Sequence, residues 1–147
     1  MREGQTAMNA ESESNPKSSK ALSEALQGGI DAQFRLAKAL EEDDDFELAR
    51  AWYQKAAGKG HIEAAYYCGM LCLKMKGEAL QQAAYWLGKA ANAGHIEAQH
   101  QLAVVLGDGM GVKHDPEESL RWHRIAASYG HPRSKEKLDS LNKFLGN

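Results

Sequence analysis

Two short segments of this 147-residue sequence carry side chains in a spacing that zinc enzymes use. The letters HIE occur at residues 61–63 and again at 95–97. In zinc deaminases, H-x-E supplies a metal ligand and a proton-transfer group, but a P-C-x-x-C segment is also needed, and this sequence has none. The histidines recur at regular intervals, so packed helices would hold neighbours roughly 10 Å apart, too far to share zinc through bonds of about 2.0–2.1 Å. We therefore predict a structural role for them, with no metal and no cofactor.

Cys68 and Cys72 stand four residues apart, as a metal-binding or redox pair on a helix would. They occupy positions of an apolar stripe that other parts of the chain fill with leucine, such as Leu102 and Leu106. Free cysteine behaves as a small buried hydrophobe, and side chains at this helical spacing converge poorly for a disulfide. We predict two buried free thiols.

The pattern Ser-x-x-Lys, found in penicillin-recognising enzymes, occurs at residues 14–17, 134–137 and 140–143. Neither of the S-D-N and K-T-G segments that accompany it in those enzymes is present. A hydrolase of this type is therefore only a distant alternative, and we predict no catalytic residue.

Six acids lie within residues 41–47, which read EEDDDFE. A calcium loop needs ligands at alternating positions and a turn glycine, which this run lacks. Acids just before a helix N-terminus also suit the helix dipole. We predict a solvated loop between two helices, with docking of a basic partner as the alternative.

The overall composition is that of an ordinary globular chain, with 43% hydrophobic residues, 26% charged residues and a formal net charge of -2. This charge gives no general attraction to nucleic acid or anionic membranes. No apolar run approaches the roughly 20 residues of a membrane span, and the first 20 residues lack the apolar core of a secretory signal. We expect a cytoplasmic protein with neither nucleic-acid nor membrane partners.

One phrase is repeated almost letter for letter, as KAAGKGHIEAA at residues 55–65 and KAANAGHIEAQ at residues 89–99. Each copy has a pair of alanines before its final glycine, and a tryptophan precedes the phrase at constant spacing. Such self-similarity at a fixed period is typical of repeat architectures. The structural repeat residues are Gly28, Gly60, Gly94, Gly130, Trp52, Trp86 and Trp122.

Each repeat is predicted to be a pair of helices. The first carries an apolar stripe at helical spacing, such as Ala98, Leu102, Ala103 and Leu106. The second carries the tryptophan and ends at the glycine, which can adopt the left-handed conformation that terminates many helices. The predicted N-caps of second helices are Asp45 and Asp115, the latter followed by Pro116.

The glycine joint, the tryptophan and their spacing together resemble the Sel1-like repeat, an α/α relative of the tetratricopeptide repeat. The best match is AQHQLAVVLGDGMGVKHDPEESLRWHRIAASYGH at residues 98–131, with a G-x-G-V loop, an aspartate and a W-x-x-x-A-A-x-x-G close, although Ala103 replaces the usual glycine. In the two earlier repeats EEDDDF and MKGEAL stand in for that loop. The resemblance implies a bacterial or eukaryotic adaptor that binds other proteins and has no shared catalytic residues.

The predicted fold is all-α, a short right-handed α/α solenoid of three helix pairs with terminal capping helices. Residues 1–18 are polar and predicted to be disordered, and residues 19–147 form the repeat domain. Its expected elements are an N-terminal cap helix at 19–27, helix pairs at 30–59, 62–93 and 96–129, and a C-terminal cap helix at 132–145 with a polar outer face.

By analogy with tetratricopeptide arrays, the first helices are expected to line a concave face. Beside the core stripe they carry a row of aromatic and apolar residues and a parallel row of acids. These candidate partner-binding residues are Phe34, Tyr66, Met70, His100, Val104, Asp31, Glu63 and Glu97. An apolar strip with an acidic rim would suit a peptide-binding groove. Equally, the side chains could bridge neighbouring helices, and both interpretations stay open.

The function predicted from these features is that of a non-enzymatic interaction module or adaptor. Its partner would be another protein or peptide, with the acids selecting basic or amine-bearing groups. The alternative is a self-association module, in which the same strip is buried against a second copy in a weak homo-oligomer.

Overall fold

The computed structural model describes residues 16–146, with side chains from residue 19 onward. Within this range the chain forms eight α-helices and one short 3-10 turn, with no strand, which confirms the all-α prediction. The expectation of disorder for residues 1–15 lies outside the described residues, and a helix begins at Pro16, inside the segment expected to be disordered. Contacts divide the chain into two compact units, Met1–His61 (unit 1) and Ile62–Asn147 (unit 2).

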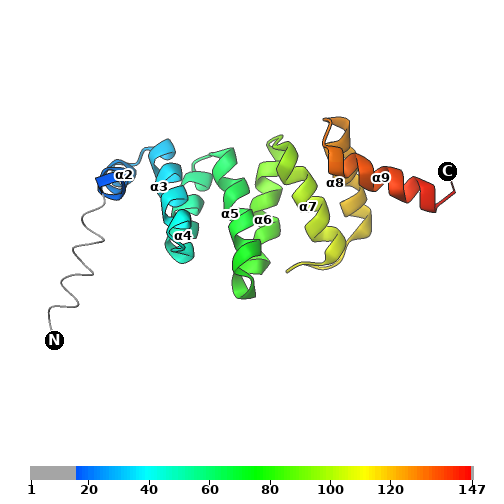
Figure 1. Ribbon diagram of the computed structural model, residues 1–147, viewed down its shortest axis with the longest axis horizontal. Coiled ribbons are helices and arrows are strands. Elements are labelled where there is room, and N and C mark those ends of the chain that lie inside the picture. Colours follow the sequence, from blue (N-terminus) through cyan, green and yellow to red (C-terminus); the bar gives the residue numbers. More distant parts are fainter. Residues whose placement is uncertain (1–15, 147) are drawn as a thin grey trace. The chain divides into compact units, whose positions relative to one another are not determined.

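Unit 1 contains α2 (Pro16–Leu26), α3 (Ile30–Glu42) and α4 (Phe46–Gly58). Helices α3 and α4 form an antiparallel pair, and α2 packs against α3 (Figure 1). The ring of Tyr53 is fully buried and lies against the ring of Phe34, and its hydroxyl donates to Glu41 Oε2 at 2.5 Å. The acids at residues 42–45 are exposed, and Asp44 turns the chain with φ 62°.

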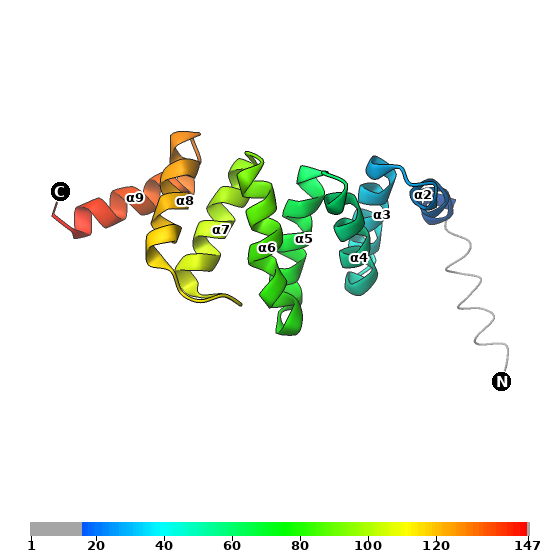
Figure 2. The ribbon, with the colours of Figure 1, turned by 180° about the vertical axis from the view of Figure 1, so that it is seen from behind.

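Unit 2 contains α5 (Ile62–Met75), the 3-10 turn η1 (Gly77–Ala79), α6 (Leu80–Asn92), α7 (Ile96–Asp108), α8 (Pro116–Ser128) and α9 (Pro132–Phe144). Each α-helix packs against the next one along the chain (Figure 2). Gly69 permits the close approach of α5 to α6, because a Cβ there would lie 2.6 Å from the Leu87 side chain. The end of α9 differs from the expected polar face, since the side chain of Phe144 is 87% exposed.

The repeated phrase forms the same joint each time, a Schellman motif followed by the next first-type helix. After α6, the N–H of Gly94 donates to Ala91 O at 3.1 Å, and the N–H of His95 donates to Ala90 O at 3.0 Å. The equivalent two bonds close α4 and α8. The joint glycines are left-handed as predicted, with φ of 89°, 97°, 96° and 90° at Gly28, Gly60, Gly94 and Gly130. The alanine pair thus serves both packing and capping. Its methyl groups are mostly buried, and its two carbonyls accept the hydrogen bonds of the Schellman motif.

The tryptophans are not equivalent in their burial. Trp86 and Trp122 are buried, whereas Trp52, at the equivalent repeat position, is only half-buried. In unit 1 the next residue, Tyr53, fills the core. The position after each tryptophan is in fact buried in every repeat, and its occupants are Tyr53, Leu87 and His123. The sequence pattern did not identify this position as buried. It did identify the core role of Cys68 and Cys72, which are both free thiols with no exposed surface.

The two predicted N-caps differ. The Asp115 side chain accepts a hydrogen bond from the Glu118 N–H at 3.1 Å, as expected, whereas Asp45 occupies the N-cap of α4 without a side-chain cap bond. The G-x-G-V loop needs both of its glycines. Gly109 and Gly111 are left-handed, with φ of 67° and 70°, and a Cβ on Gly111 would overlap the Leu80 carbonyl. None of the described helices has the length and apolar character that a membrane span requires.

Candidate functional site

The three rings of the predicted binding row each stack on a joint histidine. The stacked pairs are Phe34–His61 in unit 1, and Tyr66–His95 and His100–His131 in unit 2, with ring centroids 4.5, 4.5 and 4.1 Å apart. One side of each ring is therefore covered by packing within the repeat. Phe34 and Tyr66 stay half-buried, whereas His100 is only 5% exposed. The row bridges helix and joint, and Phe34 and Tyr66 also contact Tyr53 and Tyr67 while keeping part of their surface exposed.

The joint histidines in unit 2 have a second role as N-caps. The Nδ1 of His95 accepts from the Ala98 N–H at 3.1 Å, and the Nδ1 of His131 accepts from the Ser134 N–H at 3.3 Å. An accepting Nδ1 carries no proton, so the neutral ring has its proton on Nε2. The residues of the predicted acidic row lie near this Nε2 position. The carboxylate-to-Nε2 distances are 3.5 Å for Asp31–His61, 4.0 Å for Glu63–His95 and 2.8 Å for Glu97–His131.

Glu97 is bound more closely than the other two acids. Its carboxylate lies 2.8 Å from His131 Nε2 and accepts from Arg133 at 2.9 Å and from Gln101 at 3.2 Å. Burial alone would raise the pKa of Glu97, but hydrogen bonds from His131 and Gln101, with the charges of His131 and Arg133, hold that pKa below its usual value. The side chains of Asp31 and Glu63, by contrast, are 85% and 58% exposed. The acidic rim is therefore open at these two residues and internally paired at Glu97.

Tyr66, Met70 and Val104 form the accessible apolar part of the predicted site in unit 2, and all three are half-buried. Tyr66 and Met70 lie one turn apart on α5, and Val104 lies on α7. The pKa of the Tyr66 hydroxyl is raised by burial and then by the negative charge of Glu97. Because Tyr66 stacks on His95, the N-cap of α7, Tyr66 lies beside the N-terminal end of α7.

A buried cluster of polar side chains lies where α7, α8 and α9 meet. The hydroxyl of Ser134, which has no exposed surface, lies 2.7 Å from His100 Nδ1 and 3.0 Å from His123 Nδ1. Burial, followed by the charges of His131 and Arg133, lowers the pKa of His100 to about 4. Burial, followed by the charge of Lys137, lowers the pKa of His123. Both rings are therefore neutral at pH 7.

A pocket of about 260 Å³ opens beside this cluster. Helix α7 contributes His100, Ala103, Val104, Gly107 and Asp108, α8 contributes Ser119 and His123, and α9 contributes Arg133 and Lys137. The hydroxyl of Ser119 is already used, because it donates to the Ala103 carbonyl at 2.6 Å. The two histidine rings are thus the neutral polar groups of this pocket with hydrogen-bonding capacity left.

Neither His123 nor the buried role of Ser134 was predicted from the sequence. A register argument could have found His123, because it aligns with the buried Tyr53 and Leu87 one residue after each tryptophan. Ser134 aligns with the buried Ala98 of the preceding repeat, so a polar residue there signals a buried hydrogen bond. Neither position reveals its partner without the structure.

The structure separates Ser134 from the chemistry that its Ser-x-x-Lys pattern suggested. Its hydroxyl is buried and bonded to two histidine rings rather than to Lys137. The pair at residues 140–143 lies on an exposed part of α9, and residues 14–17 fall outside the described side chains. In the part of the chain that the structure describes, no group of three or more His, Cys, Asp or Glu side chains is placed to hold a metal ion.

The helix pairs and their joints match a known family. The model of the Sel1 repeat matches residues 30–61, 62–95 and 96–131, which together make up more than half of the chain. The chain belongs to the Sel1 repeat family. Sel1 repeats generally mediate protein–protein interactions and typically form non-enzymatic scaffolds. Among curated proteins, none matches this chain significantly.

Solved structures of Sel1 repeat proteins share the fold. One is c5321, described as a protective antigen of uropathogenic Escherichia coli strains with an SLR fold, at 30% identity and a TM-score of 0.73 over 86% of this chain. Another is a Sel1 repeat protein from Oxalobacter formigenes, at 27% identity and a TM-score of 0.71 over 80% of this chain. This chain spans 28% and 51% of the lengths of those two chains.

Proposed function

We propose that this Sel1 repeat protein is a non-enzymatic adaptor that binds another protein or peptide through the first helices of its repeats. In unit 2 the contact surface is the α5–α7 face, defined as Tyr66, Met70 and Val104 with Glu63 at its edge. The observation that carries this proposal is the state of Tyr66, whose ring is held by stacking on His95 while the residue stays half-exposed. A rigid, partly exposed aromatic ring beside apolar neighbours is the usual anchor of a protein interface.

The exposed acids favour a partner with basic groups. The side chain of Glu63 is 58% exposed beside Tyr66 in unit 2. In unit 1, Asp31 is 85% exposed on the same helix as Phe34, so the same pairing of ring and acid occurs there. Rim charges of this kind mainly govern the rate and salt dependence of association. A Lys or Arg side chain of the partner next to an aromatic ring would also gain a cation–π contact.

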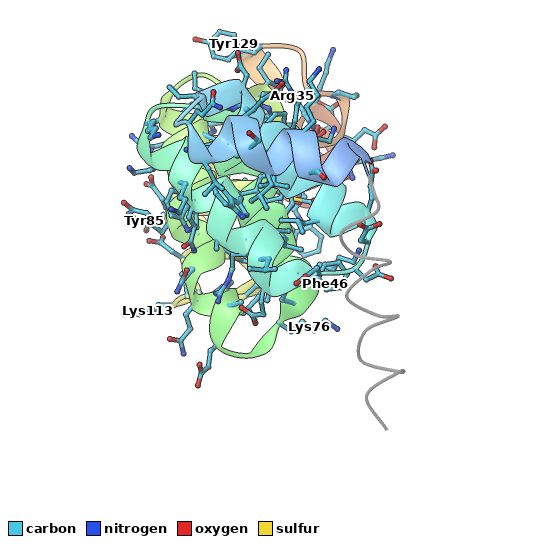
Figure 3. All side chains as sticks on the ribbon, turned by 90° about the vertical axis from the view of Figure 1, so that its left-hand side faces the viewer. Arg35, Phe46, Lys76, Tyr85, Lys113 and Tyr129 are labelled. Carbon is cyan, nitrogen blue, oxygen red and sulfur yellow. The ribbon has the colours of Figure 1, made fainter. Side chains whose placement is uncertain are left out.

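The central test is the double variant Tyr66→Ala with Met70→Ala. If the α5–α7 face binds the partner, loss of its anchor should weaken capture of that partner about thirty-fold or more. The matched control is Tyr85→Ala on α6, because Tyr85 is 58% exposed and projects away from the ribbon in Figure 3. Capture from the native lysate would be quantified protein by protein for the wild type and both variants, with helicity and melting temperature measured on the same samples.

Three results would decide the proposal. Selective loss of one captured protein by the folded double variant, but not by Tyr85→Ala, supports it. Undiminished capture by the folded double variant contradicts it, and the acids at residues 41–47 then become the next candidate. A wild-type mass that rises with concentration, and returns to the monomer in the double variant, would show that the face binds a second copy instead.

A further inference from the structure

Helix α9 is attached to unit 2 mainly through polar groups. Among its side chains, all of which the structure describes, only Ser134 is buried. Leu138 and Leu141 are half-buried, and Phe144 is exposed. Helices in folded proteins are stabilised mostly by the burial of an apolar face, and α9 buries little of its own. Its attachment therefore depends strongly on the polar contacts around Ser134 and on the joint before the helix.

The hydroxyl of Ser134 is shared between two histidine rings, and this sharing requires neutral histidine. The oxygen lies 2.7 Å from Nδ1 of His100 on α7 and 3.0 Å from Nδ1 of His123 on α8, and no other side-chain bond of Ser134 is formed among the described residues. One of the two Nδ1 atoms must be unprotonated to accept the hydroxyl hydrogen. If both rings are protonated, both Nδ1 atoms carry hydrogens, and the buried hydroxyl is left without an acceptor.

The N-cap of α9 has the same requirement. Nδ1 of His131 accepts from the Ser134 N–H at 3.3 Å, which is possible only while that nitrogen carries no hydrogen. Protonated His131 keeps its contact with Glu97 through Nε2, at 2.8 Å, but no longer caps α9. The ring of His131 also stacks on that of His100, so positive charge on both rings is repulsive.

The charged neighbours of the two buried rings also oppose protonation. Among the described residues they are Glu97 and Asp108 on α7, and His131, Arg133 and Lys137 on α9 and the joint before it. Burial is the first cause that lowers the pKa of His100 and of His123, and the positive groups of α9 and its joint lower both further. Glu97 opposes the shift at His100 without cancelling it, and the pKa of His100 is about 4. A proton on either ring is therefore unfavourable while α9 is attached.

We propose that the cluster of His100, His123 and Ser134 is a pH-sensitive switch that favours release of α9 from α7 and α8 as the pH falls from neutral to about 5. Release uncovers the two rings, which then bind protons at the ordinary histidine value near 6.5. Proton binding thus stabilises the released form in acid, and the attached form is favoured above pH 6.5. Because helices of a solenoid contact only their neighbours, the last one can open while the preceding pairs stay folded.

Release also changes the surface of α7. His100 loses the ring of His131 that covers it, and Glu97 loses its bonds to His131 and Arg133. His100 and Glu97 belong to the rows of candidate partner-binding residues, so acid would extend the α5–α7 face along α7. Only this consequence rests on the proposed function, because the release itself is a property of the chain alone.

Native-state hydrogen exchange of the full chain tests the release directly. The reporters are the amides at residues 136–141, because a detached helix of 13 residues is marginal in water and loses its hydrogen bonds. Their opening constant, corrected for the intrinsic exchange rate, should rise about 25-fold or more between pH 7.5 and pH 5.0. That factor is expected from His100 alone, with a pKa of about 4 in the attached form and 6.5 in the released form. The amides at residues 84–90 of α6 should stay better protected than those of α9 at both pH values.

The preceding repeat offers a matched variant without the sensitive rings. At the three equivalent positions that repeat carries Tyr66, Leu87 and Ala98. The corresponding triple variant is His100→Tyr, His123→Leu and Ser134→Ala. In the preceding repeat the joint histidine still stacks on the aromatic ring, so α9 should stay attached and most of the pH response should disappear. The control is His114→Asn, at an exposed loop position, which should keep the full response.

Three results would overturn the proposal. Equal opening constants for the amides of α9 and α6 at pH 5.0 would show that no separate release occurs. An opening constant of α9 that does not change with pH would show that the cluster does not sense protons, and so would a full rise in the folded triple variant. If the triple variant does not fold, the two wild-type results still decide. No partner enters these measurements, so they leave the Tyr66 and Met70 test of the proposed function unaffected.

Discussion

The ring of Tyr66 on α5 stacks on the ring of His95 in the next joint along the chain, with centroids 4.5 Å apart and planes inclined by 22°. His95 at the same time accepts the Ala98 N–H and so caps α7. His95 therefore packs against the aromatic row and is also part of the repeated joint. Glu63, the acid of the same repeat, lies 4.0 Å from His95 Nε2. A side chain of the candidate binding face is in this way positioned by the element that builds the repeat.

Substitutions at His95 should separate its two roles. His95→Asn and His95→Ala both lose the stack on Tyr66, but asparagine is among the best N-cap residues and alanine among the poor ones. His95→Ala should therefore be less stable than His95→Asn by about 1 kcal/mol. Urea denaturation of the two variants and the wild type measures the difference. Identical stabilities for the two variants would show that the cap to Ala98 contributes nothing.

Glycine-to-alanine substitutions should change the free energy of unfolding in opposite directions at two positions, one in a joint and one inside α6. Gly94 has φ 96° and no atom within 4 Å of the position that a Cβ would take, so Gly94→Ala meets only backbone strain and should destabilise by about 1–2 kcal/mol. Gly88, inside α6, also has open space around it. Gly88→Ala should stabilise by about 0.5–1 kcal/mol, because alanine favours the helix. Denaturant midpoints would test the pair, and a stabilising Gly94→Ala would contradict the assigned joint conformation.

Equivalent tryptophans should differ in their contribution to stability. Trp86 is 9% exposed, so Trp86→Ala should cost about 3–5 kcal/mol. Trp52 is half-buried at the same repeat position, and Trp52→Ala should cost clearly less. Thermal and chemical unfolding of both variants would measure the effect. The burial pattern would be refuted if Trp52→Ala proved as damaging as Trp86→Ala.

Acid should destabilise the protein through the buried histidines. The folded-state pKa of His100 is about 4 and that of His123 is also lowered from 6.5, so the unfolded chain binds more protons between those values. The full stability is present above pH 6.5 and is lost as pH falls below that value, with the loss from His100 continuing to about pH 4. From His100 alone, the loss between pH 7 and pH 5 should be on the order of 2 kcal/mol.

Two variants make this pH response specific. His123→Leu introduces the residue type that α6 has at the same repeat position, Leu87, and should reduce the loss of stability between pH 7 and pH 5. The exposed His114 serves as the control, because His114→Asn should retain the full response. Urea titrations at the two pH values test both. An unchanged acid response in a folded His123→Leu variant would show that His123 is not the sensitive group.

The sequence alone determined the local features of this protein. The left-handed glycines, the alanine pairs that accept the Schellman bonds, the cap at Asp115 and the buried Cys68 and Cys72 were all predictable. Each depends on the conformational preference of one residue or on helical periodicity within a few turns. Because three copies of the joint repeat the same residues at nearly constant spacing, local signals reinforce one another and also identify the family.

Tertiary packing decided the candidate site. Periodicity shows which side of a helix a residue occupies but not which side chain from another helix meets it there. His100, predicted as a contact residue, is buried because His131 covers its ring and Ser134 binds its Nδ1, contacts separated by 31 and 34 residues of chain. In the first repeat Tyr53 is buried in the core and Trp52 is only half-buried, a difference that helical periodicity does not show. The pocket beside His100 and His123 combines residues of α7, α8 and α9. The burial of the two polar rings depends on the partner that α9 supplies, the Ser134 hydroxyl.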